Sequence, residues 1–169
     1  LAAFFPTSPY FKSWQIITHM FMHGGIMHIA FNMLTLASFG PLLERFLGEK
    51  KYILLYFLSG LGAYALNSLW IYYEMIAEEQ FINVAMLGAS GAIFGVVAAF
   101  TALYPNAEMM IMFIPFPIKA KILLPIVIVG SIYLGINNVG GVAHFAHIGG
   151  ALVGYILIKI WGRNRYRIN

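Results

Sequence analysis

Apolar residues fill most of the chain in five long stretches, which short polar connections separate. A helix that crosses a bilayer needs about 20 consecutive apolar residues, so we expect five membrane spans. They lie at about residues 26–43, 52–73, 86–104, 122–136 and 142–161. The pattern therefore predicts an all-α membrane protein. We expect one membrane domain over residues 1–169, with residues 1–25 as an outer loop.

Proline limits two of the apolar regions. The fourth stretch is short and contains Pro125, so a less regular helix is expected there. Residues 109–118 are also apolar, but Pro115 and Pro117 interrupt them, which indicates an interfacial loop rather than a span. The chain begins at Leu1 with about a dozen loop-like residues. We expect the native N-terminus, including another membrane helix, to lie before them.

Composition supports the membrane assignment and excludes several kinds of chemistry. Hydrophobic residues make up 61% of the 169 residues and charged residues only 9%, whereas a soluble domain carries about 25% charged residues. Lipid must therefore cover this surface. Cysteine is absent, which excludes disulfides, a thiol nucleophile and cysteine metal sites. Aspartate is absent as well, so a Ser-His-Asp triad is impossible within this chain.

Charge placement predicts the orientation of the spans. Nine of the ten basic residues fall on one side of the predicted membrane, and Lys12 falls alone on the other. The nine are Arg45, Lys50, Lys51, Lys119, Lys121, Lys159, Arg163, Arg165 and Arg167. This asymmetry follows the positive-inside rule. The net charge of +4 is thus a sign of topology, and no nucleic-acid partner is expected.

The same orientation brings the unusual polar residues to one depth. The first, third and fifth spans all begin at the outer face. Near those starts lie His28 and Asn32, then Ser90, and finally His144 and His147. The candidate chemistry is therefore expected near the outer leaflet.

Ser90 lies in a run of small residues, Gly88-Ala89-Ser90-Gly91. A serine at a helix start lies beside unpaired backbone N–H groups and the positive end of the helix, which favour a developing oxyanion. Two ordinary roles compete: a helix N-cap and close helix packing through Gly91 and Gly95, a GxxxG pair. Taken alone, Ser90 favours these ordinary roles.

His147 carries the stronger signal, because an ionisable residue inside an apolar span is costly and usually functional. Gly150 and Gly154 form a second GxxxG pair on the helical face of His147. Packing of this face against the glycine face of the third span would bring His147 within reach of Ser90. Histidine is the usual base for activating a serine.

Other histidines allow two interpretations. His28 and Asn32 are four residues apart, so they share a helical face and could both donate hydrogen bonds to an oxyanion. Together with His19, His23 and the later histidines they also permit a metal site. An HExxH signature is absent and no carboxylate lies near these histidines in sequence, so no metal and no cofactor is expected.

With these motifs in order, the chain resembles the rhomboid family of intramembrane serine proteases. His23-x4-His28-x3-Asn32 is similar to the oxyanion-side motif of the family, and Gly88-Ala89-Ser90-Gly91 resembles its GxSG nucleophile motif. Ala146-His147-Ile148-Gly149-Gly150 resembles the catalytic-histidine motif, and Glu44-x3-Gly48 resembles an inner-end motif. The resemblance covers residues 14–161.

The resemblance implies a rhomboid-like helical bundle, a six-helix core whose first helix is absent here. It implies a Ser90–His147 dyad, an oxyanion hole of His28, Asn32 and the Ser90 N–H, and Phe94 in the place of a tyrosine that stacks on the histidine. Further implied elements are a gate near residues 122–136, a cap near residues 137–142, and a cleft packed by Gly88, Gly91, Gly95, Gly150 and Gly154.

The implied activity is cleavage of single-span membrane proteins near the outer leaflet, in a bacterial inner (plasma) membrane, with lipid as the other partner. Alternatives are a catalytically silent relative that binds membrane helices, a histidine–metal hydrolase, and a transporter or channel. A transporter or channel would need polar residues along a path across the bilayer, and the predicted spans do not provide one. The sequence does not indicate an oligomeric state.

Overall fold

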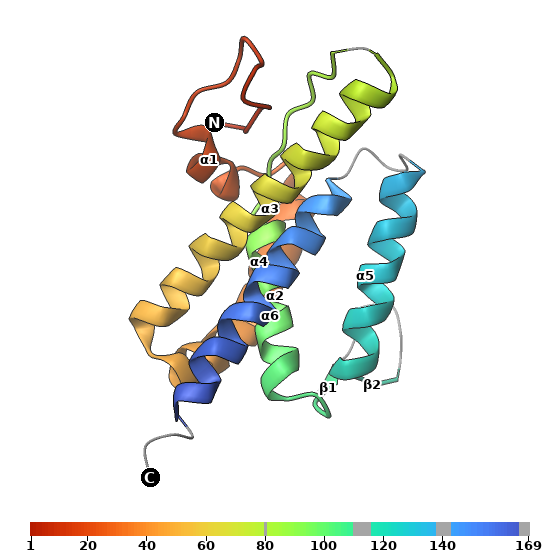
Figure 1. Cartoon of the computed structure of the whole chain (residues 1–169). Coiled ribbons are helices and arrows are strands. Elements are labelled where there is room, and N and C mark those ends of the chain that lie inside the picture. Colours follow the sequence, from red (N-terminus) through yellow and green to blue (C-terminus); the bar gives the residue numbers. More distant parts are fainter. Residues whose placement is uncertain (80, 110–115, 138–142, 166–169) are drawn as a thin grey trace.

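The computed structural model describes residues 1–79, 81–109, 116–137 and 143–165, with side chains to residue 162. The described part is a helical bundle (Figure 1). Its elements in chain order are α1 (Gln15–Thr18), the 3₁₀ turn η1 (His19–Phe21), α2 (Ile26–Leu47), α3 (Glu49–Ala77), α4 (Ser90–Leu103), β1 (Glu108–Met109), β2 (Ile118–Lys119), α5 (Ala120–Ile136) and α6 (His144–Arg165).

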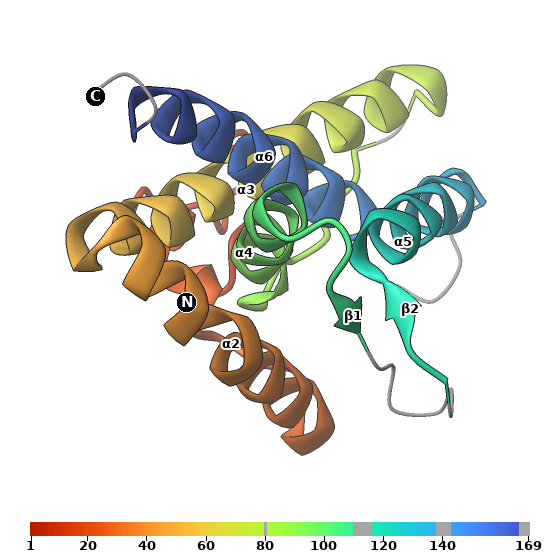
Figure 2. The same cartoon turned by 90° about the horizontal axis from the view of Figure 1, so that it is seen from below.

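Helix α4 is the centre of the bundle. It contacts α2, α3, α5 and α6, which surround it when the bundle is viewed from below (Figure 2). Nine of its 14 residues are buried, and most of these are small. Because other helices cover it, α4 has no need of a lipid-facing surface of its own.

Helix lengths differ in a way that sets the depth of the α4 N-terminus. Among the described helices, α2, α3 and α6 are long and apolar enough to cross a membrane, whereas α4 and α5 are shorter. A 14-residue helix is about 21 Å long, against about 30 Å for the hydrocarbon core. One end of α4 must therefore lie inside the bilayer thickness, and the connections on that side must reach inward to it.

Glycines let α6 approach α3 and α4 closely. A Cβ atom on Gly150 would overlap the carbonyl of Gly91, and one on Gly154 would overlap the carbonyl of Gly95. On the next helix face, a Cβ on Gly149 would overlap the carbonyl of Gly62 in α3. The two GxxxG pairs expected from the sequence thus meet each other in the structure.

Larger apolar side chains pack between the helices at the end of the bundle where α2 and α6 end and α3 begins. One buried cluster draws on four helices; its members are Leu43, Leu47, Leu55, Val96, Ala99, Phe100 and Ile158. The ends of α2 and α6 and the start of α3, which carry most of the basic residues, lie at this same end. The aliphatic cluster holds the bundle together where glycine packing is absent.

Helix α5 is attached to the rest at both ends. At its start, Ala120 and Leu123 pack with Met109 of the short β1–β2 pair. The two strands are antiparallel, with Glu108 opposite Lys119. Of the interfacial loop predicted at residues 109–118, residues 110–115 lie outside the described part. At the other end of α5, Gly135 lies against the Phe145 ring of α6.

The third apolar stretch begins before its helix does. Residue 86 is apolar, but α4 starts only at Ser90. Met86 is extended and pairs with Ala3 through two backbone hydrogen bonds of 2.7 and 2.8 Å. Gly88 then has φ +123°, a conformation that other residues rarely adopt. Periodicity could not reveal this, because apolar extended and helical segments look alike over four residues.

The glycine contacts generate a stability prediction. Gly150→Ala places a methyl group against the Gly91 carbonyl, so α6 must shift and the fold should lose about 1–3 kcal/mol. Gly130→Ala is the matched control, because nothing lies within 4 Å of its Cβ position. Alanine is also the better helix former, so this variant should gain up to about 1 kcal/mol. Thermal unfolding in detergent measures both. Equal effects of the two substitutions would contradict the close α4–α6 packing.

Candidate active site

Ser90 and His147 are brought together at the end of the bundle where α4 and α6 begin. Ser90 is the first residue of α4, and His147 lies in the first turn of α6. The His147 Nε2 atom is 2.9 Å from the Ser90 Oγ atom, a hydrogen bond between residues 57 positions apart in sequence. A serine hydroxyl bonded to an imidazole nitrogen is the arrangement from which histidine can accept the hydroxyl proton.

The glycine register explains why these two side chains meet. Gly91 follows Ser90 directly and touches Gly150, which lies three residues after His147. One turn further along, Gly95 touches Gly154. Two backbone contacts on one line fix both the rotation and the sliding of α6 against α4. The positions of the neighbouring side chains are then set within narrow limits.

Phe94 holds the His147 ring in its plane. The two rings are stacked with centroids 4.3 Å apart and an angle of 4° between planes. His144 meets His147 edge-on, with centroids 6.3 Å apart. The stacking restricts rotation of the imidazole about χ2 and adds no competing hydrogen bond, so Nε2 stays directed at Ser90.

His28 reaches the same place from α2. The Gly24 N–H donates to His28 Nδ1 at 3.2 Å, so Nδ1 has no proton and the proton of the neutral ring is on Nε2. The Nε2 atom lies beside Gly88: a Cβ there would be 2.9 Å from His28 Nε2 and 3.5 Å from Ser90 Oγ. An N–H donor therefore lies close to the serine oxygen, and only glycine leaves room between them.

Asn32 is placed one turn further along α2 than His28. Its side chain is 6% exposed, and the Nδ2 amide has no hydrogen-bond partner. A buried N–H group without an acceptor costs about 1–3 kcal/mol. Asn32 is not among the residues that line the pocket described next. The Ser90 N–H belongs to the first turn of α4, where helical N–H groups have no acceptor within the helix.

A pocket of ≈ 480 Å³ opens beside Ser90. Its wall combines the starts of α4 and α6 with residues 85–88 and with Gly24 and His28. Met86 is in an extended bridge with Ala3, so the pocket has a peptide segment on one side and the Ser90–His147 pair on another.

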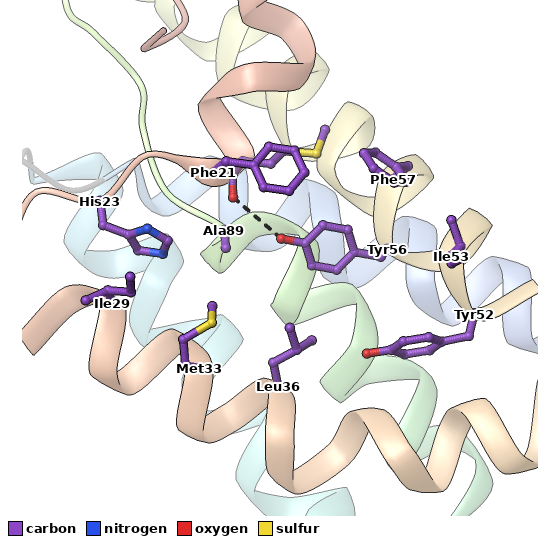
Figure 3. Close-up of a pocket in the computed structure, with 11 residues that line it drawn as sticks. Phe21, His23, Ile29, Met33, Leu36, Tyr52, Ile53, Tyr56, Phe57 and Ala89 are labelled. Atoms are coloured by element: carbon purple, nitrogen blue, oxygen red, sulfur yellow. Dashed lines mark hydrogen bonds between the residues drawn. The ribbon is translucent and has the colours of Figure 1, made fainter. Parts of the chain in front are cut away.

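A second hollow lies between α2 and α3 and is a different kind of surface. This apolar groove of ≈ 470 Å³ is shown in Figure 3. Leu36 and Met33 of α2 face Tyr52 and Tyr56 of α3 across it. Neither Ser90 nor His147 lines it. The Tyr56 hydroxyl donates to the Met20 carbonyl at 3.5 Å, and His23 adds a polar side chain to a wall that is otherwise mostly apolar.

His19 and His23 serve the structure around the site. His19 is buried, its Nδ1 is 3.0 Å from the Gln15 carbonyl, and its own carbonyl accepts the Gly88 N–H at 2.9 Å. His23 meets His28 edge-on with ring centroids 5.2 Å apart. Burial and, to a lesser degree, His28 lower the pKa of His23. Among the residues that the structure describes, no three His, Cys, Asp or Glu side chains are grouped to hold a metal ion.

Two features of the site had no sequence signal. Gly24 acts through its backbone N–H, which every residue except proline has. Met86 is held through its backbone, whose two hydrogen bonds go to Ala3 of the N-terminal segment. The gate proposed at residues 122–136 coincides with α5, while residues 138–142 of the proposed cap lie outside the described part.

Comparison with known proteins gives a consistent result. A model of the Rhomboid domain matches residues 10–164. RHOMBOID-like protein 4 of Arabidopsis thaliana is 32% identical over 86% of this chain and 33% of its own length. The mitochondrial Rhomboid protein 1 of Saccharomyces cerevisiae is 33% identical over 84% of this chain and 40% of its length. Rhomboid protease AarA of Providencia stuartii is 32% identical over 85% of this chain and 54% of its length.

The fold and the site together define a class of protein. It is a helical membrane bundle with a hydrogen-bonded serine–histidine pair at one end. The chain belongs to the rhomboid family. It is an integral membrane protein and spans about a third to a half of the length of the curated relatives that it matches. These relatives include bacterial and mitochondrial proteins, so the likeness does not choose between membranes.

The buried His19 generates a prediction about pH. Burial lowers its pKa below the ordinary value of 6.5, although hydrogen bonds to the Gln15 and Ile16 backbone oppose this. The unfolded chain therefore binds more protons than the folded protein once the pH falls below 6.5, so stability must fall with it. Above pH 6.5 the group contributes no pH dependence.

His19→Gln removes this titration and keeps a side-chain hydrogen-bond donor. The variant should be less stable than the parent at pH 7.5 but should lose less stability between pH 7.5 and pH 5. Thermal unfolding midpoints in detergent across this range measure the difference. Parallel pH profiles for the two proteins would show that His19 does not titrate on unfolding.

Proposed function

We propose that this chain is the membrane domain of a serine endopeptidase that cleaves other membrane proteins within or near their membrane segments. The observation that carries the proposal is the 2.9 Å contact of His147 Nε2 with Ser90 Oγ beside an open pocket. Membership of the rhomboid family and the similarity to a rhomboid protease support it.

The reaction would proceed by acyl transfer. Ser90 Oγ attacks the scissile carbonyl carbon while His147 Nε2 accepts the hydroxyl proton. When the C–N bond breaks, the imidazolium returns that proton to the leaving amine. Water then enters, loses a proton to His147 and attacks the ester, and Ser90 leaves with the proton restored.

Negative charge on the tetrahedral oxygen would be stabilised by groups near Ser90. His28 Nε2–H, the Ser90 N–H and the amide of Asn32 are the proposed donors. The buried Asn32 amide without a partner favours this role. Its N–H group destabilises the resting protein, and a hydrogen bond to the oxyanion would remove that destabilisation. This is the differential stabilisation that catalysis requires.

A dyad without a carboxylate needs another means of orienting the histidine. In the usual triad a carboxylate holds the ring. Here the stacked Phe94 ring is proposed to do so through packing. Unlike a carboxylate, the Phe94 ring carries no negative charge and accepts no hydrogen bond from the imidazole N–H, so it acts on the position of the ring.

The pocket suits an extended peptide rather than a helix. Met86 N–H and C=O bond to Ala3, and Gly88 N–H bonds to His19, so the backbone groups of the alternate residues 85 and 87 face the other way. A helix hides its own carbonyls, so a membrane substrate must unwind locally before attack. The unwound strand could then pair with this free edge.

The proposed substrates are therefore single-span membrane proteins, cut near the outer leaflet. The depth follows from the position of Ser90 at the end of a short helix and from the one-sided distribution of basic residues. Lipid surrounds the site laterally, and no cofactor takes part in the proposed chemistry.

Cleavage of a labelled single-span substrate by the purified protein tests the proposal. Ser90→Ala should lower kcat at least about 10⁴-fold, since it removes the nucleophile, and chelator should have no effect. Cleavage that persists in Ser90→Ala would disprove the mechanism, and sensitivity to chelator would then favour a histidine–metal hydrolase. Binding of substrates without any cleavage would favour a silent helix-binding relative.

Asn32→Leu tests the proposed oxyanion donor. Its kcat should fall about 10²-fold while KM changes little, because the charge exists only in the transition state. Its thermal stability should stay equal or rise, because a buried amide without a partner is removed. Rates and unfolding midpoints are measured on the same preparation.

Thr101→Val is the matched control for that variant. Thr101 Oγ1 is also buried without a partner, but it lies 11 residues further along α4 than Ser90. This variant should gain stability and keep full activity. An Asn32→Leu enzyme with normal kcat would exclude Asn32 from the reaction.

A further inference from the structure

The segment that leads into Ser90 is held from outside by the N-terminal part of the chain. We call residues 83–88 the rim segment, because they border the pocket, and residues 1–19 the N-terminal strap. Each of the polar ties between them joins residues about 70 or more positions apart in sequence. The rim segment has no helix of its own to hold it, so its position depends on these ties.

The backbone ties occupy one edge of the rim segment. Ala3 exchanges two hydrogen bonds with Met86, at 2.7 and 2.8 Å, and the His19 carbonyl accepts the Gly88 N–H at 2.9 Å. These contacts involve alternate rim residues, as one edge of an extended strand requires. On the opposite edge, Ala85 and Leu87 line the pocket, and within the described part of the chain their backbone groups pair with no other backbone group.

A side-chain tie fixes the start of the rim segment. The Ser8 hydroxyl donates to Asn83 Oδ1 at 2.8 Å and accepts from the Tyr10 N–H at 3.2 Å. Ser8 is 6% exposed, so both hydrogen-bonding functions of a buried hydroxyl are satisfied. This bond sets the distance along the strand between Asn83 and the Met86–Ala3 pair.

The strap is itself anchored to the helices. Tyr64 of α3 donates its hydroxyl to the Phe4 carbonyl at 3.0 Å, and the Phe5 ring stacks on Tyr72. Ala3 and Met86 also share a buried cluster with Ala146, the residue before His147. The strap therefore connects the rim segment to the helices that carry the reacting groups.

We propose that the N-terminal strap is a fixed positioning element of the substrate site, and that Ser8 and Asn83 are positioning residues that keep the free edge of residues 85–87 in register with Ser90. The proposal rests on the proposed peptidase function. Neither residue touches the reacting atoms. Loss of their bond should weaken engagement of an extended substrate and leave the chemistry at Ser90 intact.

A double-mutant cycle in the purified protein tests this. Ser8→Ala and Asn83→Ala should each raise KM for the membrane substrate about 3- to 10-fold, the range expected for one hydrogen bond, with kcat within about twofold. The double variant should equal either single variant, because the two residues act through one contact. Ser8→Thr keeps the hydroxyl and should restore the parent KM.

Labelling of Ser90 by a small fluorophosphonate separates this inference from the function on which it rests. The probe needs the activated serine but not the rim edge, so the Ser8 and Asn83 variants should be labelled at the parent rate. Thr18→Val is the matched control, because it removes a strap hydrogen bond to the Leu1 carbonyl that does not touch the rim. Its KM should be unchanged.

Two outcomes would overturn the inference while leaving the peptidase proposal in place. One is a parent enzyme whose Ser90-dependent cleavage is unaffected by Ser8→Ala and Asn83→Ala. The other is an equal loss of kcat, fluorophosphonate labelling and thermal stability in both variants, which would indicate a merely structural role. A parent that does not cleave at all would instead count against the function.

A disulfide tests whether the strap stays in place during turnover. The chain has no cysteine, so Ala3→Cys with Met86→Cys gives one defined pair at a hydrogen-bonded antiparallel position. Cα atoms at such positions are about 5.5 Å apart, within disulfide range. The oxidised protein should be as active as its own reduced form. Activity that is lost on oxidation and restored by reductant would show that the strap must lift.

Discussion

Contact between the backbones of α4 and α6 sets the geometry of the end of the bundle where these two helices begin. In a membrane there is no hydrophobic gain from bringing helices together, so association depends on close packing and on polar contacts. The paired glycines provide the first, and the Ser90–His147 hydrogen bond lies directly at the end of the line that they form. A methyl group on that line would move the histidine as well as the helix, so stability and reactivity share one structural origin.

The short central helix allows polar groups to lie within the bundle without facing lipid. Because α4 is enclosed by its neighbours, its N-terminal N–H groups and Ser90 are covered by other helices. Few polar side chains lie in this region. Ser90 is hydrogen-bonded to His147, His28 accepts the Gly24 N–H at Nδ1, and the buried Asn32 amide has no partner. Neutral donors and a neutral base avoid the cost of a buried charge, which suits a chain without aspartate.

Segments outside the helices complete the site. The N-terminal strap contains only one short helix, α1, and the rim segment contains none, yet their backbone groups pair with each other. Of the two hollows described, only the one that the rim segment borders contains Ser90 and His147, and the α2–α3 groove has neither residue. The two hollows have nearly the same volume, ≈ 480 and ≈ 470 Å³, so they differ in the residues that line them rather than in size.

Much of this architecture was predictable from local pattern. Long apolar stretches specified a helical membrane protein, because a bilayer admits few other structures, and the GxxxG spacing indicated which helical faces would meet. The four-residue spacing of His28 and Asn32 likewise placed them on one face. The family resemblance was confirmed by the comparisons. The expected spans at residues 122–136 and 142–161 correspond closely to α5 and α6, whereas α4 begins four residues after the apolar stretch that contains it.

What the sequence alone determined is therefore the set of apolar helices, their glycine faces and the residue types capable of reaction, since each depends on spacing within a few turns. Only the tertiary structure decided that Gly24 fixes the His28 tautomer, that Asn32 is buried without a partner, and that Ala3 and Ser8 hold residues 83–86. These features arise between segments distant in the chain, and most act through backbone atoms that every residue type shares. No pattern of side chains along the sequence can encode such contacts, because they exist only once the helices have packed.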